Sequence, residues 1–389
     1  FLPHRGDADS IGTVISKTPR IRSACMRHTA IVSLLLAGGC ARVPEMPAVD
    51  GSSVQIVRSA TSRSKGDAGF SDTLQILWFG SACHEIRLGD LSVVTDPFVT
   101  NGLKLRGLVS DPERVDKTLG MLDPPAAVIV NHAHYDHLLD AHAALSLPAW
   151  KNAKVPLYGS PTCCNLIAAW KDDEVSARCH PLHAGDRPVL GLPTNHRLRI
   201  HAFRGAHNPH LSCGKLFFDG TLSHAPEKPD TVFDYVCGEV LNYLLEMTSP
   251  DGTTFKVVFL GGPGDPAWIP KGIAPVDVVI VPTPGVEYLD GHLIKHLEKL
   301  RPRHIVLNHF NNFFAADAGK KHPDAKDPDE RTLPIDFPKA QWLAREIQKH
   351  YIAKQGAGSV FEKLHIPSLS RMSSHGNARN VILIEKTPR

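Results

Sequence analysis

The sequence predicts an α/β fold with a functional site at one sheet edge, and two features of the chain predict it. Short apolar runs typical of buried strands alternate with helical segments from residue 74 onward. Several of these runs end on His, Asp or Gly; the run Ala126–Val130, for example, leads into Asn-His-Ala-His-Tyr-Asp-His. Because ligands of α/β sheets bind beyond the carboxyl ends of the strands, we expect these side chains to share one site.

The elements are expected in the following order. Apolar or alternating runs predict strands at Leu74–Phe79, Cys83–Leu88, Leu91–Thr95, Ala126–Val130, Val155–Tyr158, Leu198–Phe203, Phe255–Leu260, Val276–Val281 and Arg303–Leu307. The pair Gly89-Asp90 is a turn of the kind that joins hairpin strands. Helices are expected at Leu138–Leu147 and Pro161–Trp170.

The densest group of metal-binding residues directly follows the strand Ala126–Val130. His132 and His134 are two residues apart, so an extended segment points both to one side. Asp136 and His137 begin a turn into the helical segment, where they can face a second metal. Imidazole and carboxylate are ligands that zinc and similar divalent metals prefer. The cluster therefore predicts a metal site, and the flanking strand and helix disfavour the alternative of a His-rich surface loop.

The composition is that of an ordinary globular protein with ample core: 389 residues, 42% hydrophobic and 21% charged. A net charge of +3 without a run of Lys and Arg disfavours nucleic acid as a partner. No apolar run reaches the ~18 residues of a membrane span. A serine hydrolase is disfavoured because the chain has no Gly-x-Ser-x-Gly elbow.

The N-terminal region has the features of an export signal. A basic start at Met26-Arg27-His28 precedes a short apolar core, and the ending Gly38-Gly39-Cys40 resembles a bacterial lipoprotein signal with lipid on Cys40. We expect a periplasmic or membrane-anchored lipoprotein that contacts membrane only through that lipid, or a cytoplasmic protein if the segment is merely an unstructured leader. The expected parts are an upstream or disordered leader (1–25), the signal (26–40), a flexible linker (41–72) and one globular domain (73–389).

The cysteines leave the redox state open. Cys25 and Cys40 aside, six remain, an even number that export would allow to pair. Adjacent Cys163 and Cys164 fit either buried thiols or disulfide partners. No pair has Cys-x-x-Cys spacing, which disfavours a cysteine zinc knuckle.

The order of these motifs over about residues 74 to 320 resembles the metallo-β-lactamase superfamily. The matching features are Asp96-Pro97 at a strand end, His132-x-His134-x-Asp136-His137, His207 after a strand, a Gly-rich strand end before Asp265, and His309 after the last strand. The resemblance implies an αββα sandwich with two metals. The opening Leu77-Trp78-Phe79-Gly80 together with Asp96-Pro97 is most similar to the branch with ascorbate-phosphate lactonases and phospholipase-D-like phosphodiesterases.

The resemblance also implies a ligand set of two zinc ions, with manganese or iron as alternatives. His132, His134 and His207 match the first metal's ligands, with His210 as a competitor for His207. Asp136, His137 and His309 match the second metal's, which makes Asp136 and His137 catalytic residues as well. Asp96 is expected to accept a hydrogen bond from the outer nitrogen of a ligand imidazole.

One position departs from the family pattern. A bridging Asp usually follows a Gly after the strand that corresponds to Phe255–Leu260, but this chain has Gly261-Gly262 there. The nearest carboxylate is Asp265. Either the loop brings Asp265 to the metals, or the bridge is missing.

These residues predict a metal-dependent hydrolase of a small molecule, in which metal-activated hydroxide attacks an ester, lactone, phosphodiester or amide bond. One alternative is an iron-dependent oxidoreductase on the same scaffold. The other is a degenerate member that binds metal without turnover, which the missing bridge would favour. The oligomeric state is left open.

Overall fold

The structure is a computed structural model that describes residues 61–63, 73–100, 107–207, 211–212, 215–216, 218–284, 291–310, 337–355, 359–367, 371–372 and 378–386. Contacts divide the chain into Phe1–Pro47 and Ala48–Arg389, and every described residue belongs to the second unit. The expected signal at 26–40 and all of the expected linker except 61–63 lie outside the described residues. No helix within the described ranges has the length and apolarity needed to cross a bilayer.

The first sheet of the described chain is mixed, with strand order β1-β18-β2-β3-β4-β5-β6-β7 and β17 paired to β18. Its strands are β1 (Thr61–Arg63), β2 (Leu74–Gly80), β3 (Cys83–Leu88), β4 (Leu91–Thr95), β5 (Ala127–Ile129), β6 (Leu157–Gly159), β7 (Cys179–Pro181), β17 (Arg371–Met372) and β18 (Ala378–Ile384). The strands β4 to β7 run parallel to one another, whereas β2, β3 and β4 form an antiparallel meander.

The second sheet has the order β16-β15-β14-β13-β12-β9-β8. Its strands are β8 (Val189–Gly191), β9 (Arg197–Arg204), β12 (Leu241–Thr248), β13 (Thr254–Phe259), β14 (Val278–Pro282), β15 (His304–Asn308) and β16 (Lys363–His365). The strands β13 to β16 are parallel. Since β12 is antiparallel to both β9 and β13, β9 runs in the same direction as β13. A separate short hairpin joins β10 (Leu211–Ser212) and β11 (Lys215–Leu216).

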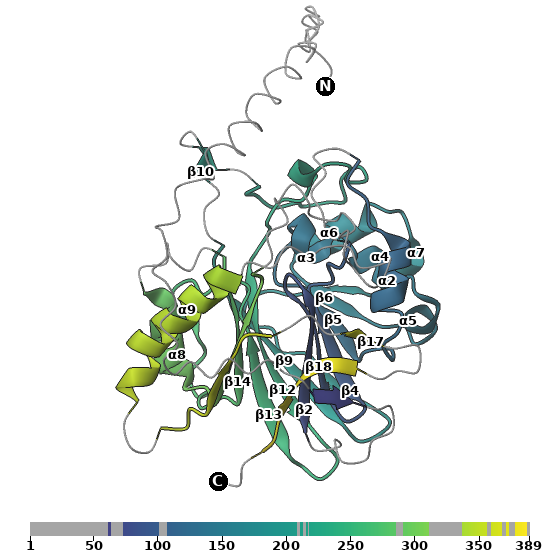
Figure 1. Ribbon diagram of the computed structural model, residues 1–389. Coiled ribbons are helices and arrows are strands. Elements are labelled where there is room, and N and C mark those ends of the chain that lie inside the picture. Colours follow the sequence, from purple (N-terminus) through teal and green to yellow (C-terminus); the bar gives the residue numbers. More distant parts are fainter. Residues whose placement is uncertain are drawn as a thin grey trace, which may run out of the picture. The chain divides into compact units, whose positions relative to one another are not determined.

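The two sheets pack face to face. Alternate side chains of both sheets fill one core between them, including Ile86, Val93, Ile129, Ile200, Tyr243 and Val257. The opposite faces are covered by helices (Figure 1). Strands such as β5 and β14 are buried on both faces and are almost wholly apolar, whereas β3 and β9 also carry His, Glu or Arg.

Helices cover the outer face of each sheet. On the first sheet they are α2 (Pro112–Thr118), α3 (Tyr135–Leu138), α4 (Ala141–Leu145), α5 (Pro148–Asn152), α6 (Pro161–Ala168) and α7 (Asp173–Ser176). On the second they are α8 (His292–Leu300) and α9 (Phe337–His350). Short 3₁₀ turns are η2 (Val232–Asp234), η3 (Pro266–Trp268) and η5 (Ile352–Lys354). The helix–sheet–sheet–helix order confirms the expected αββα sandwich.

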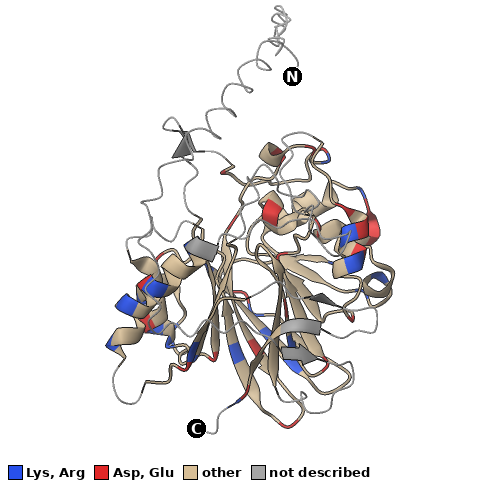
Figure 2. Cartoon of the chain, in the orientation of Figure 1, with Lys and Arg blue, Asp and Glu red and all other residues tan. Residues whose placement is uncertain are grey.

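The expected strands all occur, with ends shifted by up to two residues. In place of one helix over Leu138–Leu147, α3 ends at Leu138 and α4 covers Ala141–Leu145; Asp140 between them accepts hydrogen bonds from Val99 N and Thr100 N, at 2.6 and 2.7 Å. The sequence did not predict β12, which lies between β13 and β9 in the second sheet. Figure 2 shows Lys and Arg interspersed with Asp and Glu on the outer helices rather than gathered in one basic region.

Candidate metal centre

The strand ends bring the predicted residues to one edge of the sandwich. Asp96 follows β4, His132 follows β5, His207 follows β9 and His309 follows β15. The two sheets are joined at this edge by hydrogen bonds from Leu241 N to Asn131 O (2.8 Å) and from His309 N to Ser81 O (2.9 Å). The parallel direction of these strands is therefore what collects residues from positions 96 to 309.

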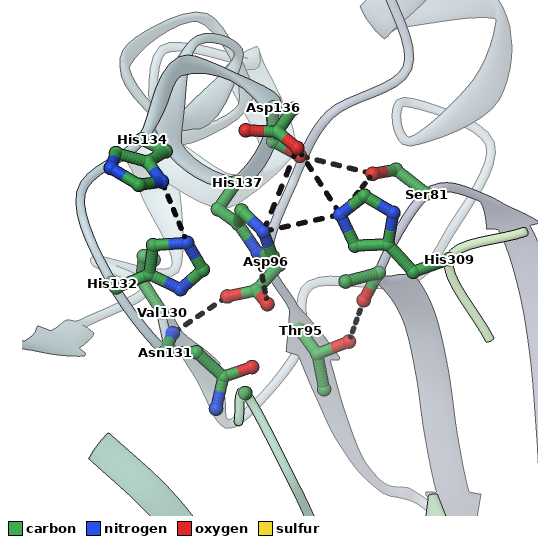
Figure 3. Close-up of polar contacts among 12 residues, drawn as sticks. Ser81, Thr95, Asp96, Val130, Asn131, His132, His134, Asp136, His137 and His309 are labelled. Carbon is green, nitrogen blue, oxygen red and sulfur yellow. Dashed lines mark hydrogen bonds and ion pairs between the residues drawn. The ribbon is translucent and has the colours of Figure 1, made fainter. Parts of the chain in front are cut away.

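Three histidines form the first group, and each offers a ring nitrogen within 4.8 Å of the others: His132, His134 and His207. Nε2 of His132 lies 3.1 Å from Nδ1 of His134 (Figure 3). The ring of His207 lies 4.7 Å from that of His132 and 4.5 Å from that of His134, measured between centroids. This group matches the first ligand set that the sequence resemblance implies.

The second group consists of Asp136, His137 and His309. Nε2 of His309 lies 3.1 Å from Oδ2 of Asp136 and 3.3 Å from Nε2 of His137. The carboxylate and both imidazoles thus point to one place, which Figure 3 shows beside the first group. The rings of His132 and His137 are 3.9 Å apart between centroids, so the two groups adjoin.

The distances within both groups fit a bound divalent metal. A tetrahedral zinc site with bonds of ~2.0–2.1 Å separates its ligand atoms by about 3.3 Å. The close pairs in the two groups lie 3.1, 3.1 and 3.3 Å apart. Burial, together with the neighbouring His137 and His134, holds the pKa of His132 well below its usual value. Its imidazole is therefore neutral and keeps the lone pair that a metal needs.

Asp96 holds the imidazole of His137 in place. Its Oδ2 lies 2.7 Å from Nδ1 of His137, and its Oδ1 accepts from the backbone N–H of Asn131, also at 2.7 Å. Burial raises the pKa of Asp96, and the contact with His137 opposes that rise. For His137, burial lowers the pKa, but Asp96 and Asp136 raise it further than burial lowers it. A proton on Nδ1 leaves Nε2 of His137 directed toward Asp136 and His309.

A backbone carbonyl performs the same task for His134. Nε2 of His134 lies 3.1 Å from the carbonyl oxygen of Phe218. An N–H at Nε2 that donates to this carbonyl leaves Nδ1 with its lone pair toward His132. Phe218 was not predicted from the sequence, because a backbone acceptor carries no side-chain signature.

Ser81 is a second residue that the sequence did not predict. Its hydroxyl donates to the carbonyl of Asp136 (3.2 Å) and lies 3.4 Å from Nε2 of His309. Its own carbonyl accepts the backbone N–H of His309 at 2.9 Å. The only sequence signal was that the strand Leu74–Phe79 stops at Gly80-Ser81, as other strands stop at functional residues.

The backbone is left-handed at three residues of the centre that are not glycine: Ser81 (φ 45°), Asp96 (φ 36°) and His309 (φ 57°). This conformation costs an L-residue on the order of 1–2 kcal/mol. Such strain persists only where the surrounding structure enforces it. Here it turns the chain sharply at the ends of β2, β4 and β15, which aims these side chains at the centre.

Asp265 lies outside both groups. Its side chain is exposed and caps η3, with Oδ1 accepting from Ala267 N at 2.8 Å. The proposed ligand set therefore omits Asp265, in contrast to the expectation that its loop brings it to the metals. His210, the sequence competitor of His207, falls outside the described residues.

The place of the family's bridging Asp is closed by packing. A Cβ on Gly262 would overlap the carbonyl oxygen of Ala206, and one on Gly261 would lie 2.5 Å from Cβ of Asn131. Oδ1 of Asn242 accepts from Gly261 N (2.8 Å) and Gly262 N (3.3 Å) and holds both peptides there. Glycine is needed at both positions because the Asn131 side chain approaches Gly261 and the Ala206 backbone approaches Gly262 so closely.

The cysteines that the structure describes are free thiols: Cys83, Cys163, Cys164, Cys179 and Cys237. Cys83 and Cys163 lie in the apolar core, where burial raises their thiol pKa values. Cys213 and the two N-terminal cysteines fall outside the described residues.

Comparisons with known proteins identify the family of the chain. The profile of the family described as "Beta-lactamase superfamily domain" matches residues 75–309, more than half of the chain. A "UPF0173 metal-dependent hydrolase" of Methylacidiphilum infernorum is 23% identical over 163 residues, 42% of this chain and 61% of that protein. A "Cytidine monophosphate-N-acetylneuraminic acid hydroxylase" of Asterias rubens is 34% identical over 89 residues, 23% of this chain and 13% of that protein. The chain thus spans less than two thirds of either relative.

Among solved structures, the metallo hydrolase Igni18 of Ignicoccus hospitalis aligns with a TM-score of 0.42 and 15% identity, over 81% of this chain and 100% of that chain. The family profile runs from β2 to His309, the last histidine of the centre. This chain therefore belongs to the beta-lactamase superfamily.

Proposed function

We propose that the protein is a metal-dependent hydrolase of a small molecule, with its metals held by the two groups of the centre. The observation that carries the proposal is the pair of adjoining three-residue sets, His132/His134/His207 and Asp136/His137/His309, at metal-ligand spacing. Two metal sites side by side are typical of enzymes that cleave ester and phosphoryl bonds. The name of the Methylacidiphilum relative supports the same class.

The residues around the two groups hold and orient the candidate metal ligands. A divalent cation bound there would supply a nucleophile near neutral pH and polarise a carbonyl or phosphoryl oxygen. Asp96 and the Phe218 carbonyl fix which nitrogen of His137 and of His134 faces the centre. The Ser81 hydroxyl contacts both the carbonyl of Asp136 and Nε2 of His309 and so helps to position these two residues. The substrate bond belongs to the ester, lactone, phosphodiester or amide class.

The test combines metal analysis with a hydrolysis panel. Purified protein is analysed for bound zinc, manganese and iron, then assayed with p-nitrophenyl acetate, γ-butyrolactone and bis(p-nitrophenyl) phosphate. We expect bound divalent metal and EDTA-sensitive turnover that the double variant His132→Ala/His134→Ala abolishes. His224→Ala, an exposed histidine outside both groups, serves as the control. Bound metal without turnover of any of these three substrates would favour a family member that binds metal without catalysis.

An iron-dependent oxidoreductase is the second candidate, and it is favoured by the name of the Asterias relative, a hydroxylase. Three-histidine and carboxylate–histidine sets also suit iron. Anaerobic reconstitution with Fe(II) followed by measurement of oxygen uptake tests it. Oxygen uptake that requires His207 would support this candidate over hydrolysis.

We further propose that a chain starting at Met26 is exported and lipidated at Cys40, on the basis of the signal-like residues 26–40. Cells that express it are labelled with a radioactive fatty acid. Equal labelling of the Cys40→Ser variant would exclude this anchor.

A further inference from the structure

A second candidate binding site lies on β9, away from the ligand groups. It is a pocket of about 270 Å³, and its main lining residues are Arg187, His201, Phe203, Arg204, Trp268 and Pro270. Its floor is largely apolar, from Phe203, Trp268 and Pro270, while two guanidinium groups reach it from different segments. An apolar pocket with a few convergent polar groups is the usual form of a small-molecule site.

Arg204 is fixed over an aromatic ring. Its guanidinium carbon lies 4.4 Å from the centroid of the Trp268 ring. Trp268 is itself held by close packing, because a Cβ on Gly264 would lie 2.7 Å from its Cζ3. The ring limits the movement of the guanidinium, whose N–H groups can donate to an anion.

The nearby carboxylate pairs with other residues, so Arg187 and Arg204 of the pocket remain available to a ligand. His201 and Arg199 both contact Glu246 of the neighbouring strand β12, each with 3.1 Å to its Oε2, so this carboxylate is already paired. Neither Arg187 nor Arg204 forms an ion pair within the part of the chain that the structure describes. A ligand anion between them would gain two charge-assisted donors.

The pocket residue Arg204 lies close in sequence to the candidate ligand His207. Arg204 precedes His207 by three residues, which at most ~3.6 Å each span about 11 Å. The intervening segment is tied down by Gly205 N to Val240 O (2.9 Å) and Ala206 N to Gly262 O (3.3 Å). The same segment approaches Gly264, where a Cβ would lie 3.0 Å from Ala206 N and 2.7 Å from Cζ3 of Trp268. Gly205 and Ala206 thus connect a lining residue of the pocket to the candidate ligand His207.

We propose that this pocket binds an organic anion, namely a carboxylate or phosphate joined to a flat ring. The charged group lies between Arg187 and Arg204, and the ring lies on the apolar floor. That this anion is the remote end of the hydrolysed substrate rests on the proposed function, whereas the binding itself does not.

The test uses phenyl phosphate and benzoate as probes, and benzyl alcohol as the neutral control. Binding to the full chain is measured by calorimetry and by tryptophan fluorescence, with bound metal and after EDTA treatment. We expect both anions to bind at least tenfold more tightly than benzyl alcohol, with and without metal. Trp268→Phe should lose the fluorescence change.

Two pocket variants and one matched control decide the assignment. Arg204→Met and Arg187→Met should each weaken anion binding about tenfold or more, while Arg204→Lys restores part of it. Arg197→Met, at the other end of the same strand and outside the pocket, should bind as the unchanged protein does. Circular dichroism establishes that each variant is folded, and Arg187→Met replaces Arg204→Met if the latter is not.

The outcomes separate this proposal from the proposed function. Equal anion affinity in Arg204→Met or Arg187→Met and the unchanged protein overturns the pocket, as does binding that disappears with the metal. Metal-independent anion binding that needs both arginines supports it even if no hydrolysis is found. Once a hydrolysed substrate has been identified, Arg204→Met should raise KM for its acidic form. The variant should leave KM for the neutral methyl ester of that substrate unchanged.

Discussion

Oδ2 of Asp96 lies 2.7 Å from Nδ1 of His137, and the other oxygen of the same carboxylate accepts the N–H of Asn131. One buried side chain thereby connects the end of β4, the end of β5 and a candidate metal ligand. Asp96→Asn should weaken metal affinity ~10–100-fold, because the amide no longer favours the proton on Nδ1 of His137. Competition with a chromophoric chelator measures this affinity. Asp90→Asn, in the exposed β3–β4 turn, is the control. If Asp96→Asn binds metal as tightly as the unchanged protein does, Asp96 serves only as a turn residue.

The division into two groups predicts separable metal sites. His207→Ala should remove one equivalent of metal and His309→Ala another, because each variant leaves only two ligands in its own group. Inductively coupled plasma mass spectrometry of the purified variants gives the stoichiometry. Loss of all metal from either variant alone would mean that the two groups bind as one unit.

Asp265 should matter for the local turn and not for metal. Asp265→Ala removes the cap on η3, a loss that typically costs ~0.5–2 kcal/mol at helix starts. We expect a slightly lower melting temperature and an unchanged metal content. A variant that loses one metal equivalent would return Asp265 to the ligand set.

Gly262 should tolerate no side chain. Gly262→Ala places a methyl group against the carbonyl of Ala206 and must push the segment that carries His207. We expect both lower stability and weaker metal binding, with Gly191→Ala as the control, since a Cβ there meets nothing within 4 Å and the backbone of Gly191 is not left-handed. For the same reason Gly262→Asp should not rebuild the family's bridging carboxylate. Retained stability and metal in Gly262→Ala would show that the segment yields easily.

His365 predicts a loss of stability in acid. It lies 3.2 Å from His304 (Nε2 to Nδ1), and burial together with His304 lowers its pKa to about 3. The unfolded chain therefore takes up a proton first, so this stability is present above about pH 6.5 and is lost as the pH falls toward 3. Between pH 7 and 5, His365→Gln should lose up to about 2 kcal/mol less free energy of unfolding than the unchanged protein.

Urea denaturation in EDTA measures this difference without a contribution from metal release. His224→Gln, which changes an exposed histidine, should follow the unchanged protein. An identical pH dependence in His365→Gln would show that His365 is protonated equally in both states.

The sequence could predict the features that depend on residues close together in the chain. The set from His132 to His137 occupies six positions, and the strands β2, β4 and β15 are mostly apolar runs, so period and spacing revealed them. A contact of Asp96 with a ligand imidazole could be expected, but the sequence did not show that this imidazole is the one of His137. The contacts of Phe218 and Ser81 could not, since each depends on a backbone carbonyl that folding brings from far along the chain.

Asp265 shows the limit of reasoning from family position. The loop after β13 contains a carboxylate within reach in sequence, but the sequence does not show that Gly261 and Gly262 lie against Asn131 and Ala206. That packing fixes the loop and leaves Asp265 on the surface, where it caps η3. Close backbone contact, rather than ligand chemistry, decided this position.

The left-handed backbone at Ser81, Asp96 and His309 means that a substitution that relieves strain, and so raises thermal stability, would also weaken metal binding. Glycine at any of these positions would release the strain, yet at 96 and 309 it would delete a side chain of the centre. Of the three, His309 belongs to a ligand group and Asp96 contacts the ligand His137, whereas Ser81 contacts the groups through its hydroxyl and its backbone carbonyl. Under selection for heat tolerance alone, we therefore expect adaptive change to begin at residue 81, and its carbonyl contact with His309 to loosen before any ligand is replaced.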